Sequence, residues 1–270
     1  MSLVSTERRG GVAIVTYANP PIGTMTAAGA AEMLVAMADL ADDAAVRAVV
    51  ITGGMPDIFI RHYDVGELSA ASDRLAEPAP ATPPPPPPQP AEGQRPGGFL
   101  GLADLIASMG KPVIAAINGL CMGGGFELAL ACDIRVVGAA VPSIGLPETR
   151  VGIFPGGGGT QRLPRVIGEA KALEMILRGA VVDGPRAFAL GMVHEIADDP
   201  LAKALDIAAE FEGRGAEGIA FAKRLTRAAL DRPLAEGLAD ERASFGAVMR
   251  TASAREGLRA ARPPTQIEQA

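Results

Sequence analysis

The apolar positions in the first 200 residues follow two alternating patterns. Short apolar runs at residues 12–17, 46–52, 112–117 and 134–137 are typical of buried strands. Between the first two runs, residues 27–41 carry Met33, Leu34, Met37 and Leu40 at helical spacing. Strands that alternate with helices predict an α/β layer architecture with parallel pairing.

The pattern changes after residue 200. Residues 201–212, 218–230 and 234–250 are each predicted to be helical, with no strand pattern between them. We therefore expect an α/β core over residues 1–200 and a helical C-terminal region over residues 201–270. Helices that cannot all pack on one sheet often pack on a neighbouring subunit, so we expect an oligomer.

One segment of the core region has a different composition. Residues 77–98 read EPAPATPPPPPPQPAEGQRPGG, and the six consecutive prolines at 83–88 favour polyproline II. We expect a solvent-exposed, disordered insertion. The alternative is a docking tract for a partner that recognises polyproline II.

Composition excludes several classes of function. The net charge is −6 without a basic cluster, which argues against nucleic acid as the main partner. An apolar fraction of 48% without an uninterrupted run of membrane-spanning length predicts a globular protein and no membrane span. The chain enters a strand pattern at once and lacks a signal-peptide core, and its two cysteines, Cys121 and Cys132, suggest buried thiols. We expect a cytoplasmic protein.

The first candidate site lies in residues 111–137, KPVIAAINGLCMGGGFELALACDIRVV. Three glycines, Gly123 to Gly125, precede a predicted helix that has Glu127 in its first turn. Exposed N–H groups at the positive end of a helix can hold an anion or a developing oxyanion, and the carboxyl adds an acid or base. The glycines could instead serve close packing alone, and Glu127 could be favoured only by the helix dipole.

A second carboxylate follows in residues 145–165, GLPETRVGIFPGGGGTQRLPR, where Glu148 lies in a predicted loop. Two carboxylates beside an oxyanion pocket suit the addition of water across a double bond. Other chemistries lack their motifs, because the sequence has no Cys-x-x-Cys, no His-Glu-x-x-His and no Gly-x-Ser-x-Gly. We expect no metal site.

These two blocks, together with ALGMVHEI at residues 189–196, resemble the enoyl-CoA hydratase/isomerase (crotonase) family. The resemblance implies a spiral of ββα units, a C-terminal helical region used for trimerisation, and trimers that can pair into hexamers. It also implies an acyl-CoA thioester substrate, with coenzyme A as part of the substrate and no separate cofactor. The expected reaction is reversible syn hydration of a trans-2-enoyl-CoA to a 3-hydroxyacyl-CoA.

The resemblance carries over to individual residues. Glu127 and Glu148 fall on the two catalytic glutamates, with Glu148 as the acid toward the α-carbon and Glu127 assisting the water. The backbone N–H groups of Gly124 and Arg61 fall on the oxyanion hole. The expected substrate pocket comprises His62, Gly123, Pro147 and Gly156.

One stretch departs from the family pattern. The family usually shows Phe-x-Ala-Gly-x-Asp, whereas residues 59–64 read FIRHYD, so Arg61 and His62 replace the small pair. His62 could reshape the pocket, or it could donate a hydrogen bond or act as a base. This departure leaves open another acyl-CoA reaction, namely isomerisation, thioester hydrolysis or C–C cleavage. A non-catalytic scaffold that uses the polyproline tract is the second alternative.

Overall fold

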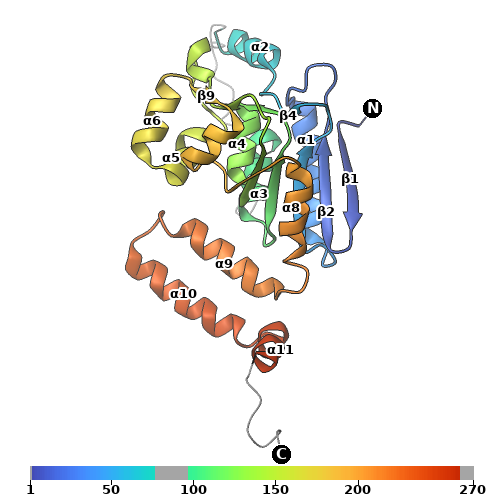
Figure 1. The fold of residues 1–270 in the computed structure, drawn as a ribbon. Helices are drawn as coiled ribbons and strands as arrows, with labels where there is room; N and C mark the ends of the chain where they lie inside the picture. Colours follow the sequence, from blue (N-terminus) through green and yellow to red (C-terminus); the bar gives the residue numbers. More distant parts are fainter. Residues whose placement is uncertain (1, 77–96, 262–270) are drawn as a thin grey trace, which may run out of the picture.

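A computed structural model describes residues 2–76 and 97–261, so nearly all of the proline-rich segment lies outside the described residues. The main sheet has six strands in the order β1-β2-β3-β5-β7-β10, and every neighbouring pair except β1 and β2 is parallel (Figure 1). These strands are β1 (Val4–Arg9), β2 (Val12–Tyr17), β3 (Ala48–Gly53), β5 (Val113–Ile117), β7 (Ile134–Gly138) and β10 (Glu195–Ala197). The predicted parallel α/β sheet is confirmed.

A second, four-stranded sheet has the order β4-β6-β8-β9. Its strands are β4 (Ile58–Ile60), β6 (Leu120–Met122), β8 (Ile144–Gly145) and β9 (Val181–Val182). The chain passes from β3 to β4, from β5 to β6 and from β7 to β8, each time leaving the large sheet for the small one and then entering a helix. This repeated strand-strand-helix order matches the expected ββα units.

Both faces of the main sheet are covered. On β3, the side chains of Val49 and Ile51 point into the larger core, which also holds helices α1 (Ala27–Asp42) and α3 (Gly98–Ser108). Val50 points the opposite way, into a smaller core beneath α8 (Pro200–Ala209), because successive strand residues face opposite sides. Burial on both faces explains the uninterrupted apolar runs in the sequence.

The C-terminal helices divide differently from the expectation. Helix α8 packs on the main sheet, so the core continues past residue 200. Helices α9 (Ala216–Ala228), α10 (Leu234–Val248) and α11 (Ala252–Ala260) extend beyond the body (Figure 1). The remaining helices are α2 (Val65–Ala76), α4 (Gly124–Ala131), the 3-10 helix η1 (Glu148–Val151), α5 (Gly159–Ile167), α6 (Glu169–Leu177) and α7 (Gly184–Leu190).

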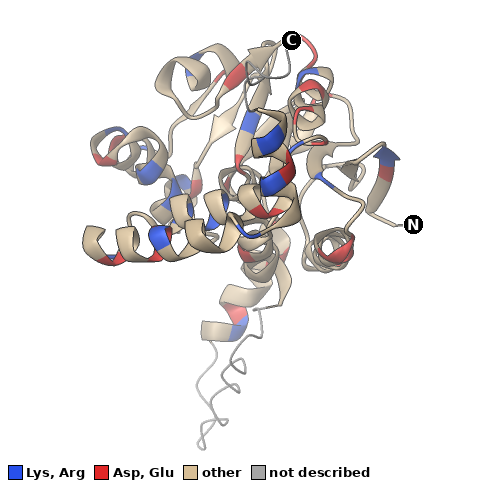
Figure 2. Ribbon diagram, turned by 90° about the horizontal axis from the view of Figure 1, so that it is seen from below, with Lys and Arg blue, Asp and Glu red and all other residues tan. Residues whose placement is uncertain are grey.

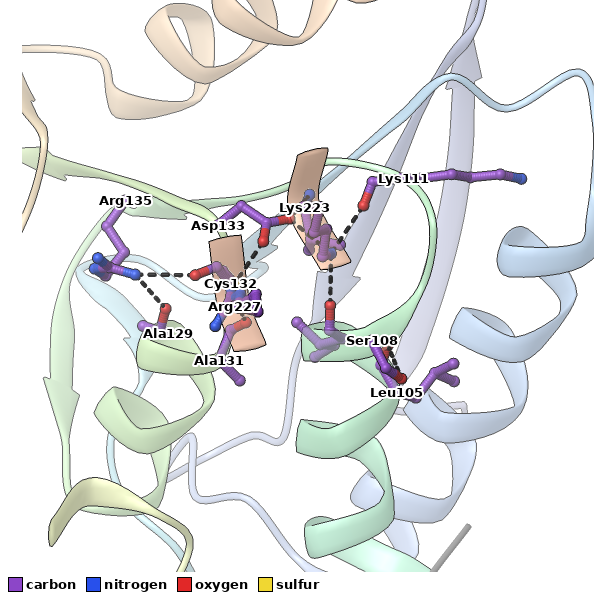
Figure 3. A network of polar contacts seen from close by, with 12 residues as sticks. Leu105, Ser108, Lys111, Ala129, Ala131, Cys132, Asp133, Arg135, Lys223 and Arg227 are labelled. Atoms are coloured by element: carbon purple, nitrogen blue, oxygen red, sulfur yellow. Dashed lines mark hydrogen bonds and ion pairs between the residues drawn. The ribbon is translucent and has the colours of Figure 1, made fainter. Parts of the chain in front are cut away.

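Helix α9 is tied to the body through Asp133, at the end of α4 (Figure 3). Asp133 pairs with Lys223 Nζ at 2.7 Å and with Arg227 Nη2 at 2.8 Å. Lys223 also donates to the carbonyl oxygens of Ile106 and Lys111, each at 2.9 Å. The side chain of Lys223 is only 8% exposed, so this ammonium group is buried with its full set of acceptors.

Charged residues of both signs are interspersed along the helices on the side of the molecule that carries α9 to α11 (Figure 2). None of the helices within the described ranges combines the length and apolarity that crossing a bilayer requires.

Candidate active site

The junction between β6 and α4 brings the backbone of two segments unusually close. Gly123 has φ of +50°, a conformation that favours glycine. A Cβ on Gly125 would lie 2.0 Å from Ile60 O, and a Cβ on Gly124 would lie 3.0 Å from Tyr63 Cβ. The three glycines therefore allow the start of α4 to pack directly against the loop after β4, with its first-turn N–H groups uncovered by side chains.

Glu127 projects from the first turn of α4 and is held by a distant glycine turn. Its side-chain oxygen Oε1 accepts hydrogen bonds from Gly157 N at 2.7 Å and Gly159 N at 2.8 Å. The residue is only 4% exposed, and burial raises the pKa of its carboxyl. The two N–H donors and the charge of Arg162 oppose that rise in pKa, because they favour the ionised form.

Glu148 occupies a different environment at the start of η1. Its Oε2 is buried without a hydrogen-bond partner, and its Oε1 lies 3.3 Å from the point that a Gly123 Cβ would occupy. Burial, together with the nearby charge of Glu127, raises the pKa of Glu148 to about 7. Burial thus raises the pKa of both carboxyls, but two amides and Arg162 oppose the rise at Glu127, whereas Glu148 Oε2 has no hydrogen-bond donor.

The amide expected to act beside Gly124 is already engaged. Arg61 N donates to Gly23 O at 2.9 Å, so its N–H is not free for a substrate oxygen. The motif in residues 59–64 could not show this, because the acceptor belongs to a separate loop near the N-terminus. This finding corrects the assignment of Arg61.

The Tyr63 amide is better placed. Its N–H has no acceptor within the described residues, and its nitrogen lies 3.3 Å from the point that a Gly124 Cβ would occupy. The carbonyl of the same peptide, His62 O, accepts from Met25 N. Because a trans peptide directs N–H and C=O to opposite sides, the Tyr63 N–H points away from Met25.

Comparisons with known proteins show the family of this chain. The enoyl-CoA hydratase/isomerase family model matches residues 91–266. The chain is 38% identical to the mitochondrial methylglutaconyl-CoA hydratase of Rattus norvegicus over 83% of this chain and 69% of that protein. It is 34% identical to a probable enoyl-CoA hydratase of Bacillus subtilis over 92% of this chain and 91% of that protein. The chain belongs to the enoyl-CoA hydratase/isomerase family.

This family member also resembles a solved structure in its fold. The crystal structure of enoyl-CoA hydratase from Bacillus anthracis matches with a TM-score of 0.81 at 27% identity, covering 96% of this chain and 95% of that one. The crotonase fold expected from the sequence is therefore confirmed.

The predicted pocket residues of this enoyl-CoA hydratase/isomerase family member lie at different distances from the carboxylates. Gly123 lies between His62 and Glu148. A Cβ built on Gly123 would lie 3.6 Å from His62 Cβ and 3.3 Å from Glu148 Oε1. His62 Nδ1 lies 2.7 Å from Tyr63 O, which it reaches as a donor. Pro147 immediately precedes Glu148 as the cap of η1. Gly156 is exposed and makes no hydrogen bond to Glu127, which is bound by the next glycines instead.

Two aromatic rings that the sequence interpretation missed lie near these residues. Tyr63 and Phe99 pack edge to face, with ring centroids 5.7 Å apart. A Cβ on Gly157 would lie 2.5 Å from Phe99 Cε1 and 2.6 Å from Glu127 Oε2, so the Phe99 ring lies beside the Glu127 carboxylate. The sequence offered little signal for Phe99, because it lies in helix α3 beyond the proline-rich segment.

Proposed function

We propose that this family member is an enoyl-CoA hydratase that adds water reversibly, with syn geometry, to a trans-2-enoyl-CoA. The observation that carries the proposal is the pair Glu127 and Glu148, one carboxyl fixed by two N–H donors and the other with an unpartnered oxygen and a pKa near 7. Water addition needs a base and an acid at once, and unequal environments supply them.

The proposed mechanism starts with the thioester carbonyl. The N–H groups of Gly124 and Tyr63 polarise its oxygen and stabilise the enolate that forms on addition. Glu127 takes a proton from water as the hydroxyl oxygen bonds to the β-carbon, and Glu148 gives its proton to the α-carbon. The product is the 3-hydroxyacyl-CoA, and the two carboxyls then exchange a proton to regenerate the starting state.

The test is incubation of the purified protein with crotonyl-CoA and with longer trans-2-enoyl-CoAs. Hydration removes the absorbance of the conjugated thioester, and mass spectrometry should find a product that has gained one water. A product of unchanged mass would indicate isomerisation, and released free coenzyme A would indicate hydrolysis. Either result in place of hydration would overturn the proposal.

The related proteins bear on the substrate class. One is named methylglutaconyl-CoA hydratase, and others are named fatty acid oxidation complex subunit alpha. We therefore propose an acyl-CoA thioester as substrate, and a panel of straight and branched enoyl-CoAs would identify the preferred acyl group. We also propose, from the sequence, that the protein works in the cytoplasm, which fractionation of the source cells would test.

We further propose a homotrimer that can pair into a hexamer. Helix α10 and the turn before it expose large apolar side chains, with Leu230 at 73%, Leu234 at 77% and Phe245 at 62% exposure. Apolar side chains grouped in this way favour burial against another chain. Size-exclusion chromatography with light scattering should give the mass of three or six chains, and a monomer would contradict the proposal.

The alternative of a non-catalytic scaffold depends on residues 77–98, nearly all of which lie outside the described residues. Deleting this segment separates the two functions. Unchanged catalysis together with loss of a bound partner would support a docking role for the segment.

A further inference from the structure

Arg162, on helix α5, contacts the glycine turn that holds Glu127. Its Nη1 donates to Gly157 O at 2.9 Å, and Gly157 N in turn donates to Glu127 Oε1 at 2.7 Å. We infer that Arg162 is a positioning residue, which fixes the glycine turn and through it the orientation of the Glu127 carboxylate. The inference rests on the proposed function only where it concerns catalysis.

The turn is shaped around the guanidinium group. Gly158 has φ of +106°, and a Cβ at this residue would lie 2.2 Å from Arg162 Nη1. The guanidinium therefore fills the space that a side chain on the turn would take. On the other side of the turn, a Cβ on Gly157 would overlap Glu127 Oε2. The turn is thus held between the guanidinium and the carboxylate, with room for glycine alone.

The same arginine acts on the charge of Glu127. Its side chain is 20% exposed, and its ion pair with Asp104 of α3 is long, with Nη2 3.4 Å from Oδ1, and involves an aspartate that is 53% exposed. A long pair with an exposed partner is a weak interaction. The charge of Arg162 accordingly lowers the pKa of Glu127, in opposition to burial.

Other charged groups face this cluster from neighbouring elements. Glu148 of η1 interacts with the charge of Glu127, and the two cations Arg162 and Arg227, the latter on α9, repel each other. Arg227 is already paired with Asp133. Arg162 is the cation whose charge acts on the Glu127 carboxylate, so it is the one expected to control its titration.

Arg165 offers a matched control on the same helix. It donates to Gln161 O and to Asp231 at 2.8 Å, and its side chain is 45% exposed. Replacing it removes one positive charge from α5 without touching the glycine turn.

The experiment compares Arg162→Gln, Arg162→Lys and Arg165→Gln. We expect Arg162→Gln to lower kcat about 10- to 100-fold with little change in KM, because misplacing a catalytic group by about 1 Å is enough for a loss of this size. The acid limb of its pH profile should move to higher pH, since loss of the positive charge raises the pKa of Glu127. Arg162→Lys keeps the charge, so its acid limb should stay in place, and Arg165→Gln should behave as the unmodified protein.

A second readout does not depend on turnover. Infrared or carbon-13 NMR titration of the carboxyl groups should show the Glu127 resonance titrating at higher pH in Arg162→Gln than in Arg165→Gln. If the unmodified protein fails to hydrate any enoyl-CoA, the proposed function fails while this titration still tests Arg162. The inference is overturned if Arg162→Gln and Arg165→Gln titrate alike, or if both Arg162 variants lose kcat equally with an unmoved acid limb.

Discussion

The charge of Glu127 acts on Glu148, but only Glu127 has a carboxyl oxygen that accepts hydrogen bonds from backbone donors of a separate turn. Glu127 Oε1 accepts from two amides at 2.7 and 2.8 Å, whereas Glu148 Oε2 has no partner among the described residues. A carboxylate that accepts two N–H bonds is stabilised in its ionised form, and a buried carboxyl without partners is stabilised in its neutral form. This asymmetry supports the proposed roles of Glu127 as base and Glu148 as acid.

Replacing either carboxyl with an amide should therefore abolish most of the activity. We expect Glu148→Gln and Glu127→Gln each to lower kcat on crotonyl-CoA by at least about 100-fold, the low end for acid–base groups. The exposed Glu169 at the start of α6 provides the control, and Glu169→Gln should leave kcat unchanged. Near-full activity in either folded active-site variant would refute its role.

The raised pKa of Glu148 should also appear in the stability of the fold. The folded state binds this proton more tightly than the unfolded chain, whose carboxyl has the ordinary pKa of 4.5. Stability from this group is present below pH 4.5 and is lost as pH rises to about 7. Glu148→Gln cannot ionise, so it should not show this loss of stability with rising pH.

Urea unfolding at pH 5 and pH 8 measures this effect. Between pH 5 and pH 8, the unmodified protein should lose about 1 kcal/mol more free energy of unfolding than Glu148→Gln does. This figure is reduced for the partial exposure of the side chain. If the difference in the free energy of unfolding between the two proteins is the same at both pH values, Glu148 has an ordinary pKa and the prediction is wrong.

Phe99 should limit the length of the acyl chain, because its ring lies beside the Glu127 carboxylate and 3.6 Å from the point that a Gly124 Cβ would occupy. Phe99→Ala should raise kcat/KM for long enoyl-CoAs relative to crotonyl-CoA by about 10-fold, the scale of discrimination by a hydrophobic pocket. The neighbouring Leu100 is 52% exposed, so Leu100→Ala serves as the control. A chain-length profile that is the same in both variants would remove Phe99 from the pocket.

Asp133 should hold α9 on the body. In Asp133→Asn, Lys223 stays buried but loses its carboxylate, and we expect a loss of about 2–3 kcal/mol in the free energy of unfolding. Hydrogen exchange should be faster in α9. Asp231, which pairs with Arg165 at the surface, is the control, and Asp231→Asn should cost less than about 1 kcal/mol. Equal losses in the two variants would contradict a special role for Asp133.

The sequence predicted the buried strands well, because their apolar runs reflect burial on both faces of the sheet. It missed β1, whose residues VSTERR are mostly exposed and carry no apolar pattern. An edge strand of this kind is defined by its pairing with β2, which no local signal reports.

The site was predictable only in part. Motif spacing led to the predictions of Glu127, Glu148 and Gly124, since each lies within a continuous block, and their roles stay predictions. It could not identify the partners that set their chemistry, because Gly157 and Gly159 reach Glu127 from 30 and 32 residues away in the chain. The hydrogen bond from Arg61 to Gly23 likewise depends on a contact between separate loops.

Helix α4 has consequences for any attempt to shorten this protein. Gly124 begins the helix at the proposed active site, and at its other end the carbonyl of Ala131 accepts from Arg227 Nη2 at 2.8 Å (Figure 3). The eight residues of α4 span only about 12 Å. This short helix therefore links the Gly124 amide at one end to the contact with Arg227 at the other. A shortened chain that ends after α8 would lose Arg227 and with it the hydrogen bond to the end of α4. Engineers who seek a minimal version should therefore retain α9, even though it contributes no atom to the chemistry proposed here.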